Sequence, residues 1–260
     1  MDVEPRSEPA PEQDQAPPPP PNVPDDGRAA APVGWEWWDA VLLFIAWQVV
    51  LGIILVAGAA IFGDLETEEA LGPALAAQNG SLVVLTLVWV AARSRRGIGT
   101  LLGPRRPTLA DVGAGIGHGV AGVVGITVGL GSLLQLLAGL FDRELPHVQE
   151  TLQDSTRASG IASFTILAIV VLAPLAEELF FRGMLFQALH KRMPLWPAIG
   201  LSSIAFGISH VEPVVVVLTF AFGLYLAWVF RRRGSLVAPI VAHMIFNLAG
   251  VILIRLDVPL

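Results

Sequence analysis

The chain has 260 residues, of which 54% are hydrophobic and only 15% are charged, and its mean hydropathy is +0.66. A soluble domain carries about 25% charged residues, so this composition excludes an ordinary soluble globular protein. Residues 1–39 hold nine Asp and Glu against two Arg, a net charge of −7. The whole chain has a net charge of −6, so residues 40–260 carry +1. No basic face is left for nucleic acid, and the lack of cysteine excludes disulfides, thiolate metal sites and cysteine nucleophiles.

The N-terminal segment is rich in Pro, Asp, Glu and Ala, and it contains five consecutive prolines from Pro17 to Pro21. Such a composition cannot bury a core, so residues 1–38 are predicted to form a disordered cytoplasmic tail. The tail could dock a partner protein, but a solvated spacer is the favoured interpretation. Trp35, Trp37 and Trp38 are predicted to lie at the membrane interface, where an indole is stable.

Apolar runs long enough to cross a bilayer follow the tail. Together they predict an all-α, polytopic transmembrane helical bundle of about seven to eight membrane segments in the cell membrane. The expected spans are 39–62, 75–92, 109–140, 161–189, 195–210, 213–230 and 236–255. The run 109–140 is longer than one perpendicular span and rich in glycine at small-xxx-small spacing, so we expect a tilted helix packed closely on its neighbours. His118 lies among these glycines and is expected to be a packing residue.

Basic residues predict the orientation of the bundle. They cluster in three loops, which seven spans would place on one side of the membrane: Arg93, Arg95, Arg96, Arg105 and Arg106; Lys191 and Arg192; Arg231, Arg232 and Arg233. Cytoplasmic loops carry the excess of Lys and Arg, so these loops and the N-terminus are predicted to be cytoplasmic. The opposite loops, 63–70 and 141–160, are acidic or mixed.

Three ionisable residues, Glu177, Glu178 and Arg182, interrupt the apolar run 161–189. Each would cost about 2.5–3.5 kcal/mol near the centre of a membrane helix unless paired or hydrated, which indicates a functional role. Glu178 and Arg182 are four apart and can pair on one helix face. Glu177 is rotated by about 100° and addresses a different surface, as a free carboxylate suited to be a general base. Alternatively, both glutamates only pair with arginine or cap backbone groups.

Two further polar motifs follow on the next apolar segments. His210 comes four residues after Phe206 and just before Glu212 and Pro213, at a probable break between short membrane segments. Irregular backbone at depth is tolerated where protein or a water-filled cavity covers it, so a hydrolytic water is expected there.

His243 and Asn247 are four apart, so they share a helix face. Both can donate a hydrogen bond to one oxygen, as in an oxyanion hole. Interhelical hydrogen bonding is the other interpretation of this pair.

The three motifs, in this order, resemble those of the CPBP intramembrane proteases (CAAX protease and bacteriocin-processing, also called Abi). The resemblance covers residues 160–255, and it divides the chain into N-terminal helices at 39–158 and a catalytic core at 159–260. It implies that Glu177 and His210 activate the attacking water, and that His243 and Asn247 form the oxyanion hole. Glu178, Arg182 and Phe206 would then support the site.

The sequence therefore predicts an intramembrane endopeptidase that cleaves a peptide or membrane-protein substrate and contacts membrane lipid, without nucleic acid. A transporter or bacteriocin-immunity protein, using the same polar cluster as a proton or ligand relay, is the alternative. No metal cofactor is predicted, because the His-Glu-x-x-His helix that usually delivers zinc is missing. Zinc bound by Glu177, His210 and His243 is the alternative.

Overall fold

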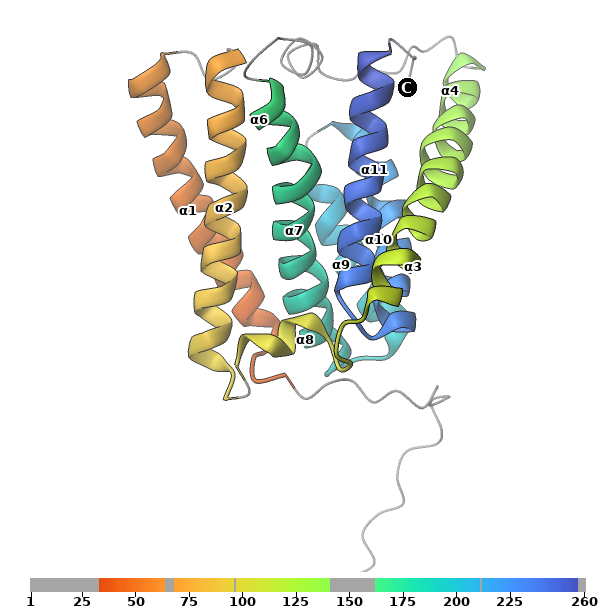
Figure 1. The fold of residues 1–260 in the computed structure, drawn as a ribbon. Helices are drawn as coiled ribbons and strands as arrows, with labels where there is room; N and C mark the ends of the chain where they lie inside the picture. The colour runs from red at the N-terminus through yellow and green to blue at the C-terminus, as the bar shows by residue number, and fades with distance from the viewer. Residues whose placement is uncertain (1–32, 64–67, 96, 141–161, 211, 257–260) are drawn as a thin grey trace, which may run out of the picture.

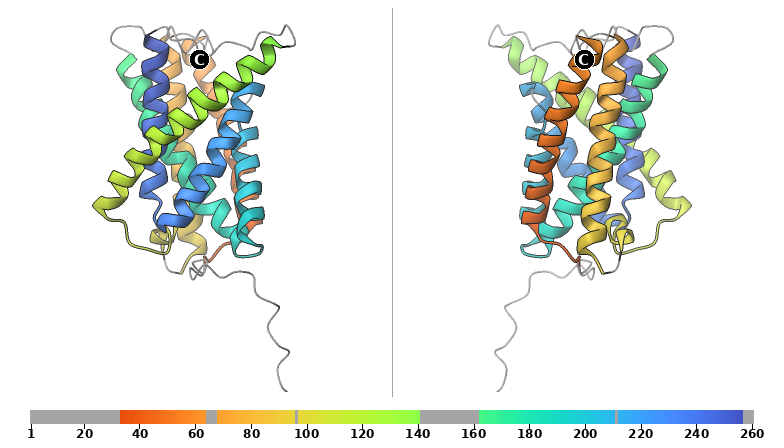
Figure 2. Two further views of the ribbon diagram at one scale, coloured as in Figure 1. Left: turned by 90° about the vertical axis from the view of Figure 1, so that its right-hand side faces the viewer. Right: turned by 90° about the vertical axis from the view of Figure 1, so that its left-hand side faces the viewer.

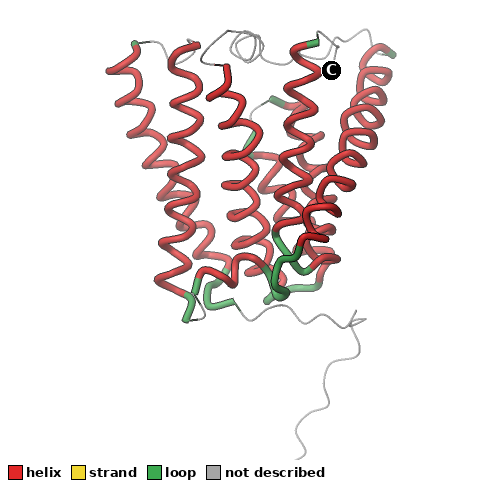
Figure 3. The backbone as a smooth tube through the Cα atoms, viewed as in Figure 1, coloured by secondary structure: helices red, strands yellow, loops and turns green. Residues whose placement is uncertain are grey.

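The structure, a computed structural model, describes residues 33–63, 68–95, 97–140, 162–210 and 212–256. Within these ranges every regular element is a helix and no strand is present (Figure 3). In chain order the elements are α1 (Trp37–Phe62), α2 (Glu68–Arg93), η1 (Ile98–Leu102), α3 (Leu109–Gly122), η2 (Val123–Leu130), α4 (Gly131–Gly139), α6 (Ala162–Leu167), η3 (Ala168–Leu172), α7 (Ala173–Glu178), η4 (Leu179–Phe186), α8 (Gln187–His190), α9 (Leu195–Ile208), α10 (Pro213–Arg233) and α11 (Val237–Arg255). The long helices lie side by side and form one bundle (Figure 1). The predicted all-α fold is confirmed.

Six helical stretches in the described part of the chain are long and apolar enough to cross a membrane. Six of the seven predicted spans match these stretches closely. The other predicted span, 195–210, corresponds to the shorter helix α9. With 14 residues, α9 is about 21 Å long, shorter than a hydrocarbon core of about 30 Å. The hairpin of α9 and α10 therefore turns short of the end that α11 reaches (Figures 1 and 3). His210, which follows α9, therefore lies next to this turn, within the bundle and short of the end that α11 reaches.

A buried tryptophan and a cluster of ion pairs hold the start of α1 against the rest of the bundle. The Trp35 side chain is fully buried, and its indole N–H donates to the Met184 carbonyl at 3.0 Å. Trp35 therefore does not present its ring to lipid headgroups as an interfacial tryptophan would, because the carbonyl inside η4 satisfies its indole. Glu36 accepts from Arg192 at 2.8 Å and from Lys191 at 2.6 Å. Arg192 and then Lys191 lower the pKa of Glu36 to about 2, so it stays ionised well into the acid range.

Two further buried carboxylates bind arginines from the predicted cytoplasmic loops. Asp39 in α1 pairs with Arg93 at the end of α2, at 2.8 Å. Asp111 in α3 pairs with Arg233 at the end of α10, at 2.9 Å, and with Arg105. These ion pairs therefore connect the ends of neighbouring helices, in addition to any effect of the arginines on membrane topology. Residues 1–32 of the predicted tail lie outside the described ranges, while Val33 and Trp35, which belong to the same predicted tail, are buried.

The glycine-rich helix packs directly on α11. Figure 2 shows α3 and its continuation through η2 and α4 crossing the bundle obliquely, as the sequence predicted. A Cβ on Gly115 would lie 2.8 Å from the carbonyl oxygen of Ala238, and one on Gly119 would lie 2.8 Å from that of Ala242. Side chains at these two positions would push α11 away. This close approach fixes the height and rotation of α11, and so of His243.

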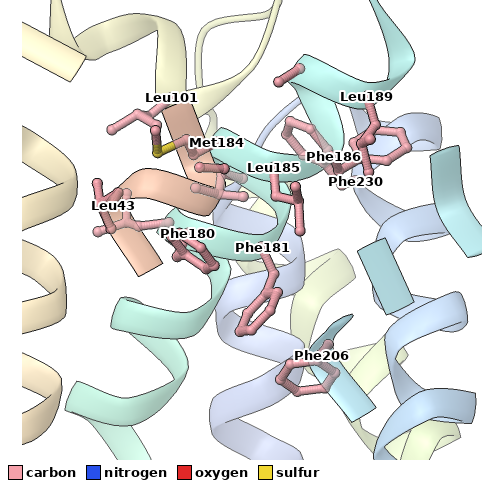
Figure 4. Packing of buried hydrophobic residues seen from close by; sticks show 14 of the residues in the cluster. Leu43, Leu101, Phe180, Phe181, Met184, Leu185, Phe186, Leu189, Phe206 and Phe230 are labelled. Carbon is pink, nitrogen blue, oxygen red and sulfur yellow. The ribbon is translucent and has the colours of Figure 1, made fainter. Parts of the chain in front are cut away.

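The core of the bundle lies around η4, whose eight residues are all buried. Figure 4 shows its aromatic and aliphatic side chains packed between α1, η1 and α9. The rings of Phe181 and Phe206 meet edge to face, with centroids 5.1 Å apart. In a bilayer such ring contacts stabilise the bundle by van der Waals packing rather than by removing apolar surface from water. The helix that carries the acidic motif is thus held rigidly at its C-terminal end.

Candidate active site

Glu178 and Arg182 form a fully buried ion pair. Their side chains are 0% and 1% exposed, and the Arg182 guanidinium donates to Glu178 Oε1 at 2.7 Å. The other guanidinium nitrogen donates to the carbonyl oxygen of Gly223 in α10 at 3.2 Å. The guanidinium carbon lies 4.4 Å from the centre of the Phe206 ring, a cation–π contact. The predicted pair is present, and it joins η4 to both α9 and α10.

His243 lies between the two adjacent glutamates. Its Nδ1 is 2.9 Å from Glu178 Oε1, and its Nε2 is 3.7 Å from Glu177 Oε2. The expectation that the two glutamates address different surfaces is therefore incomplete. Their Cβ atoms diverge by helical rotation, but their long side chains converge on opposite nitrogens of one imidazole. Because an ionised carboxylate only accepts, a hydrogen bond to Glu178 places a proton on Nδ1.

The two glutamates differ in exposure. The Glu178 side chain is completely buried, whereas that of Glu177 is 22% exposed. Within the described ranges, the Glu177 carboxylate accepts no hydrogen bond from the protein. This carboxylate is therefore the one in the cluster that can meet a water or a substrate.

Asn247 lies one helical turn beyond His243 on α11, and it is half-buried. Its side-chain amide donates to the carbonyl oxygen of Ile169 in η3 at 2.9 Å. An asparagine amide has two N–H donors, so one remains after this bond is made. The amide is thus oriented by a backbone carbonyl on the same helix that carries Glu177.

His210 is positioned by the end of α9. Its Nδ1 lies 3.0 Å from the Phe206 carbonyl oxygen, which can only accept, so this nitrogen carries a proton and Nε2 is the acceptor of the neutral ring. The His210 ring meets the Phe206 ring edge to face at 5.2 Å, and the His243 ring meets the same Phe206 ring at 5.8 Å. Phe206, 1% exposed, therefore lies between the two histidines.

Two residues of α10 support the site without having been expected from the sequence. Phe222 is buried and meets the His243 ring edge to face, with centroids 5.3 Å apart. Gly223 supplies the carbonyl that binds Arg182, and a Cβ there would lie 3.1 Å from both Phe206 and Ser203. In the sequence, the only signal that α10 approaches α9 closely is a glycine inside an apolar helix.

Two residues of the alternative zinc site, Glu177 and His243, lie next to each other. No group of three or more His, Cys, Asp or Glu side chains among the described residues is arranged to hold a metal ion. Glu177 Oε2 and His243 Nε2 lie 3.7 Å apart, close to the separation of about 3.4 Å expected for two ligands with bonds of 2.0–2.2 Å to one tetrahedral zinc. His210 Nδ1 is directed at a backbone carbonyl.

His118, the remaining histidine among the transmembrane glycines, lies outside this cluster. Its Nδ1 is 2.7 Å from the Tyr225 hydroxyl, and its ring packs edge to face on Trp228. These contacts join α3 to α10. They are those of the packing residue that the sequence predicted.

Fold and site together define a multi-pass helical membrane protein with a buried glutamate, arginine and histidine cluster. Residues 159–249 match the family of type II CAAX prenyl endopeptidase Rce1-like proteins. This is the family that the three motifs resembled, and the match confirms the resemblance over that segment. The matched segment contains all seven residues that the sequence assigned to the site.

Two curated relatives each match about a third of the chain. Human CAAX prenyl protease 2 is 31% identical over 100 residues, which are 31% of this chain and 30% of that protein. "Putative membrane peptidase YdiL" of Bacillus subtilis (strain 168) is 32% identical over 88 residues, which are 34% of this chain and 36% of that protein. The chain thus spans about a third of the length of these relatives. No solved structure matches.

Proposed function

We propose that this protein is an intramembrane endopeptidase that hydrolyses a peptide bond within or beside the bilayer. The observation that carries the proposal is the His243 imidazole held between Glu178 and Glu177, with Asn247 one turn further along the same helix. The match of residues 159–249 to CAAX prenyl endopeptidases supports it.

In the proposed mechanism, Glu177 and His210 hold the attacking water. The Glu177 carboxylate and the unprotonated Nε2 of His210 both accept hydrogen bonds, so each can polarise a water O–H. Glu177 takes a proton as the water oxygen attacks the scissile carbonyl, and the protonated carboxyl then returns that proton to the leaving amine. This is general base followed by general acid catalysis by one group.

His243 and Asn247 are proposed to stabilise the oxyanion of the tetrahedral intermediate. Asn247 contributes the amide N–H that Ile169 does not hold. His243 contributes Nε2–H when its ring carries protons on both nitrogens, with Glu178 as the counter-charge at Nδ1. One oxyanion donor removed from a well-studied protease cost about 10²–10³-fold in kcat. Glu178 and Arg182 act as positioning residues.

The substrate is proposed to be a membrane protein or membrane-bound peptide. Comparing the membrane proteome of cells that carry wild-type protein with that of cells that carry Glu177→Ala tests this. Endopeptidase activity predicts membrane proteins that accumulate uncut in the variant, with a defined cleavage site lost. A transporter or immunity protein with the same polar cluster would leave every cleavage product in place.

We also propose that the N-terminus and the three arginine-bearing loops are cytoplasmic. Because the chain has no native cysteine, single cysteines can be labelled without background. A cysteine at Thr67 is expected to react with an impermeant maleimide in intact cells. A cysteine at Arg106, an exposed residue, is expected to react only after the membrane is permeabilised. The reverse pattern would overturn the orientation.

Catalysis is expected to proceed without a bound metal ion, with zinc as the alternative. The measurement is metal analysis of active, detergent-purified protein, together with activity before and after a strong chelator. We expect activity to persist in the chelator. About one zinc per chain, with activity lost to the chelator and restored by zinc, would make Glu177, His210 and His243 the ligands to test.

A further inference from the structure

The helix that carries Glu177 changes its hydrogen-bond register just before the acidic motif. η3 is a π-helical turn of five residues, Ala168–Leu172. At its end the N–H of Ala173 donates to the carbonyl oxygen of Ala168, five residues back. This is the i→i+5 pattern of a π-helix rather than the i→i+4 pattern of an α-helix.

The next donor in that register is missing because residue 174 is proline. A continuing π pattern would send the N–H of residue 174 to the carbonyl oxygen of Ile169, and Pro174 has no N–H. The N–H of Ala173, the α-helical donor for the same carbonyl, is bound to Ala168. The Ile169 carbonyl therefore lacks its usual donor in both registers, and a backbone carbonyl of a membrane-spanning helix needs a partner within the protein.

Asn247 of α11 supplies that partner. Its amide donates to the Ile169 carbonyl oxygen at 2.9 Å, which holds one of its two N–H groups. The amide is planar, so fixing one N–H also fixes the direction of the other. An asparagine on a helix surface without such an anchor could turn about its side-chain bonds.

We propose that Pro174 is a positioning residue for Asn247. By removing the backbone donor of Ile169, it leaves this carbonyl open to the Asn247 amide, and the second amide N–H is then presented to the reacting carbonyl. The inference rests on the proposed oxyanion role of Asn247. It assigns Pro174 and the Ile169 carbonyl a part in catalysis although neither touches the substrate.

The testing variant is Pro174→Ala. It restores an N–H that competes for the Ile169 carbonyl, either directly in the π register or by letting Ala173 return to the α register. We expect kcat to fall by about tenfold, less than the 10²–10³-fold known for complete loss of an oxyanion donor. The KM should change little. The melting temperature should be equal or higher, because alanine favours a helix interior over proline.

A readout that does not depend on activity is the side-chain amide of Asn247 in protein labelled with ¹⁵N-asparagine. The chain has three asparagines, Asn22, Asn79 and Asn247, so three NH₂ signals are expected, and Asn247→Ala assigns the relevant one. In Pro174→Ala the Asn247 amide protons should shift and broaden as the anchor weakens. An unchanged Asn247 signal would overturn the proposal.

Pro73, inside α2, provides the matched control. Pro73→Ala makes the same change in another membrane helix and should leave both kcat and the Asn247 signal unchanged. The kinetic substrate is a quenched-fluorescence peptide built on the cleavage site lost in Glu177→Ala membranes.

A double variant separates this route from an indirect effect on Glu177. If Pro174 acts through Asn247, Pro174→Ala combined with Asn247→Ala should be no slower than Asn247→Ala alone. A fully active Asn247→Ala would contradict the proposed oxyanion hole, while the spectrum would still decide whether Pro174 orients the amide. A slow Asn247→Ala beside a Pro174→Ala with wild-type kcat would reject the role of Pro174.

Discussion

Replacing Glu177 by glutamine is expected to abolish proteolysis while leaving the protein folded. The amide keeps the size and polarity of the side chain but cannot accept the proton of the attacking water, and general base catalysis contributes about 10²–10⁴-fold. Little stability should be lost, because the Glu177 side chain is 22% exposed and its carboxylate lies no closer than 3.7 Å to His243 Nε2. Activity on the identified cleavage-site peptide and the melting temperature in detergent measure the two effects.

The control for this change is Glu36→Gln. It makes the same substitution away from the proposed site, at the N-terminal end of the bundle, where Glu36 pairs with Lys191 and Arg192. This variant should keep full activity even if its melting temperature falls. A Glu177→Gln protein that remains fully active after purification would remove Glu177 from the mechanism, and the general base would have to be sought elsewhere in the cluster.

The sequence was sufficient to predict the helical bundle and the buried Glu178–Arg182 pair of the site. Long apolar runs have a single stable solution in lipid, because every backbone group must be satisfied within the helix. Four-residue spacing correctly predicted that Glu178 pairs with Arg182. The same rule put His243 and Asn247 on one face of α11, which the structure also shows.

Contacts between helices were beyond such rules. Helical rotation alone separates Glu177 from Glu178, yet both reach His243, because the position of α11 is set by its close packing on the glycine face of α3. Trp35 was predicted to be interfacial because it stands with Trp37 and Trp38 just before the first apolar run, and the structure shows Trp37 and Trp38 exposed but Trp35 buried. Only the fold shows that a carbonyl in η4 receives its indole.

The second large effect is expected from Arg182→Ala, which should strongly destabilise the protein. The variant leaves the Glu178 carboxylate, 0% exposed, without the guanidinium that neutralises it. Breaking a buried ion pair from one side costs about 3–5 kcal/mol. It also removes the bond to the Gly223 carbonyl that ties η4 to α10. The melting temperature and the yield of folded protein should both fall clearly.

Removing both charges should separate stability from catalysis. A buried ion pair replaced by apolar residues of similar volume is often as stable as the original, so Glu178→Met with Arg182→Met should recover most of the stability that Arg182→Ala loses. It should remain inactive, because His243 Nδ1 then has no acceptor and its ring is no longer oriented toward Glu177.

Glu178→Gln with Arg182→Met keeps an acceptor oxygen for His243 Nδ1 and should therefore regain part of the activity at a similar melting temperature. A role for Glu178 in stability alone would instead make both double variants equally active. Full activity in the double methionine variant would show that His243 needs no anchor at Nδ1. In that case the hydrogen bond to Glu178 would serve the packing of α11 against α7 rather than the chemistry at Nε2.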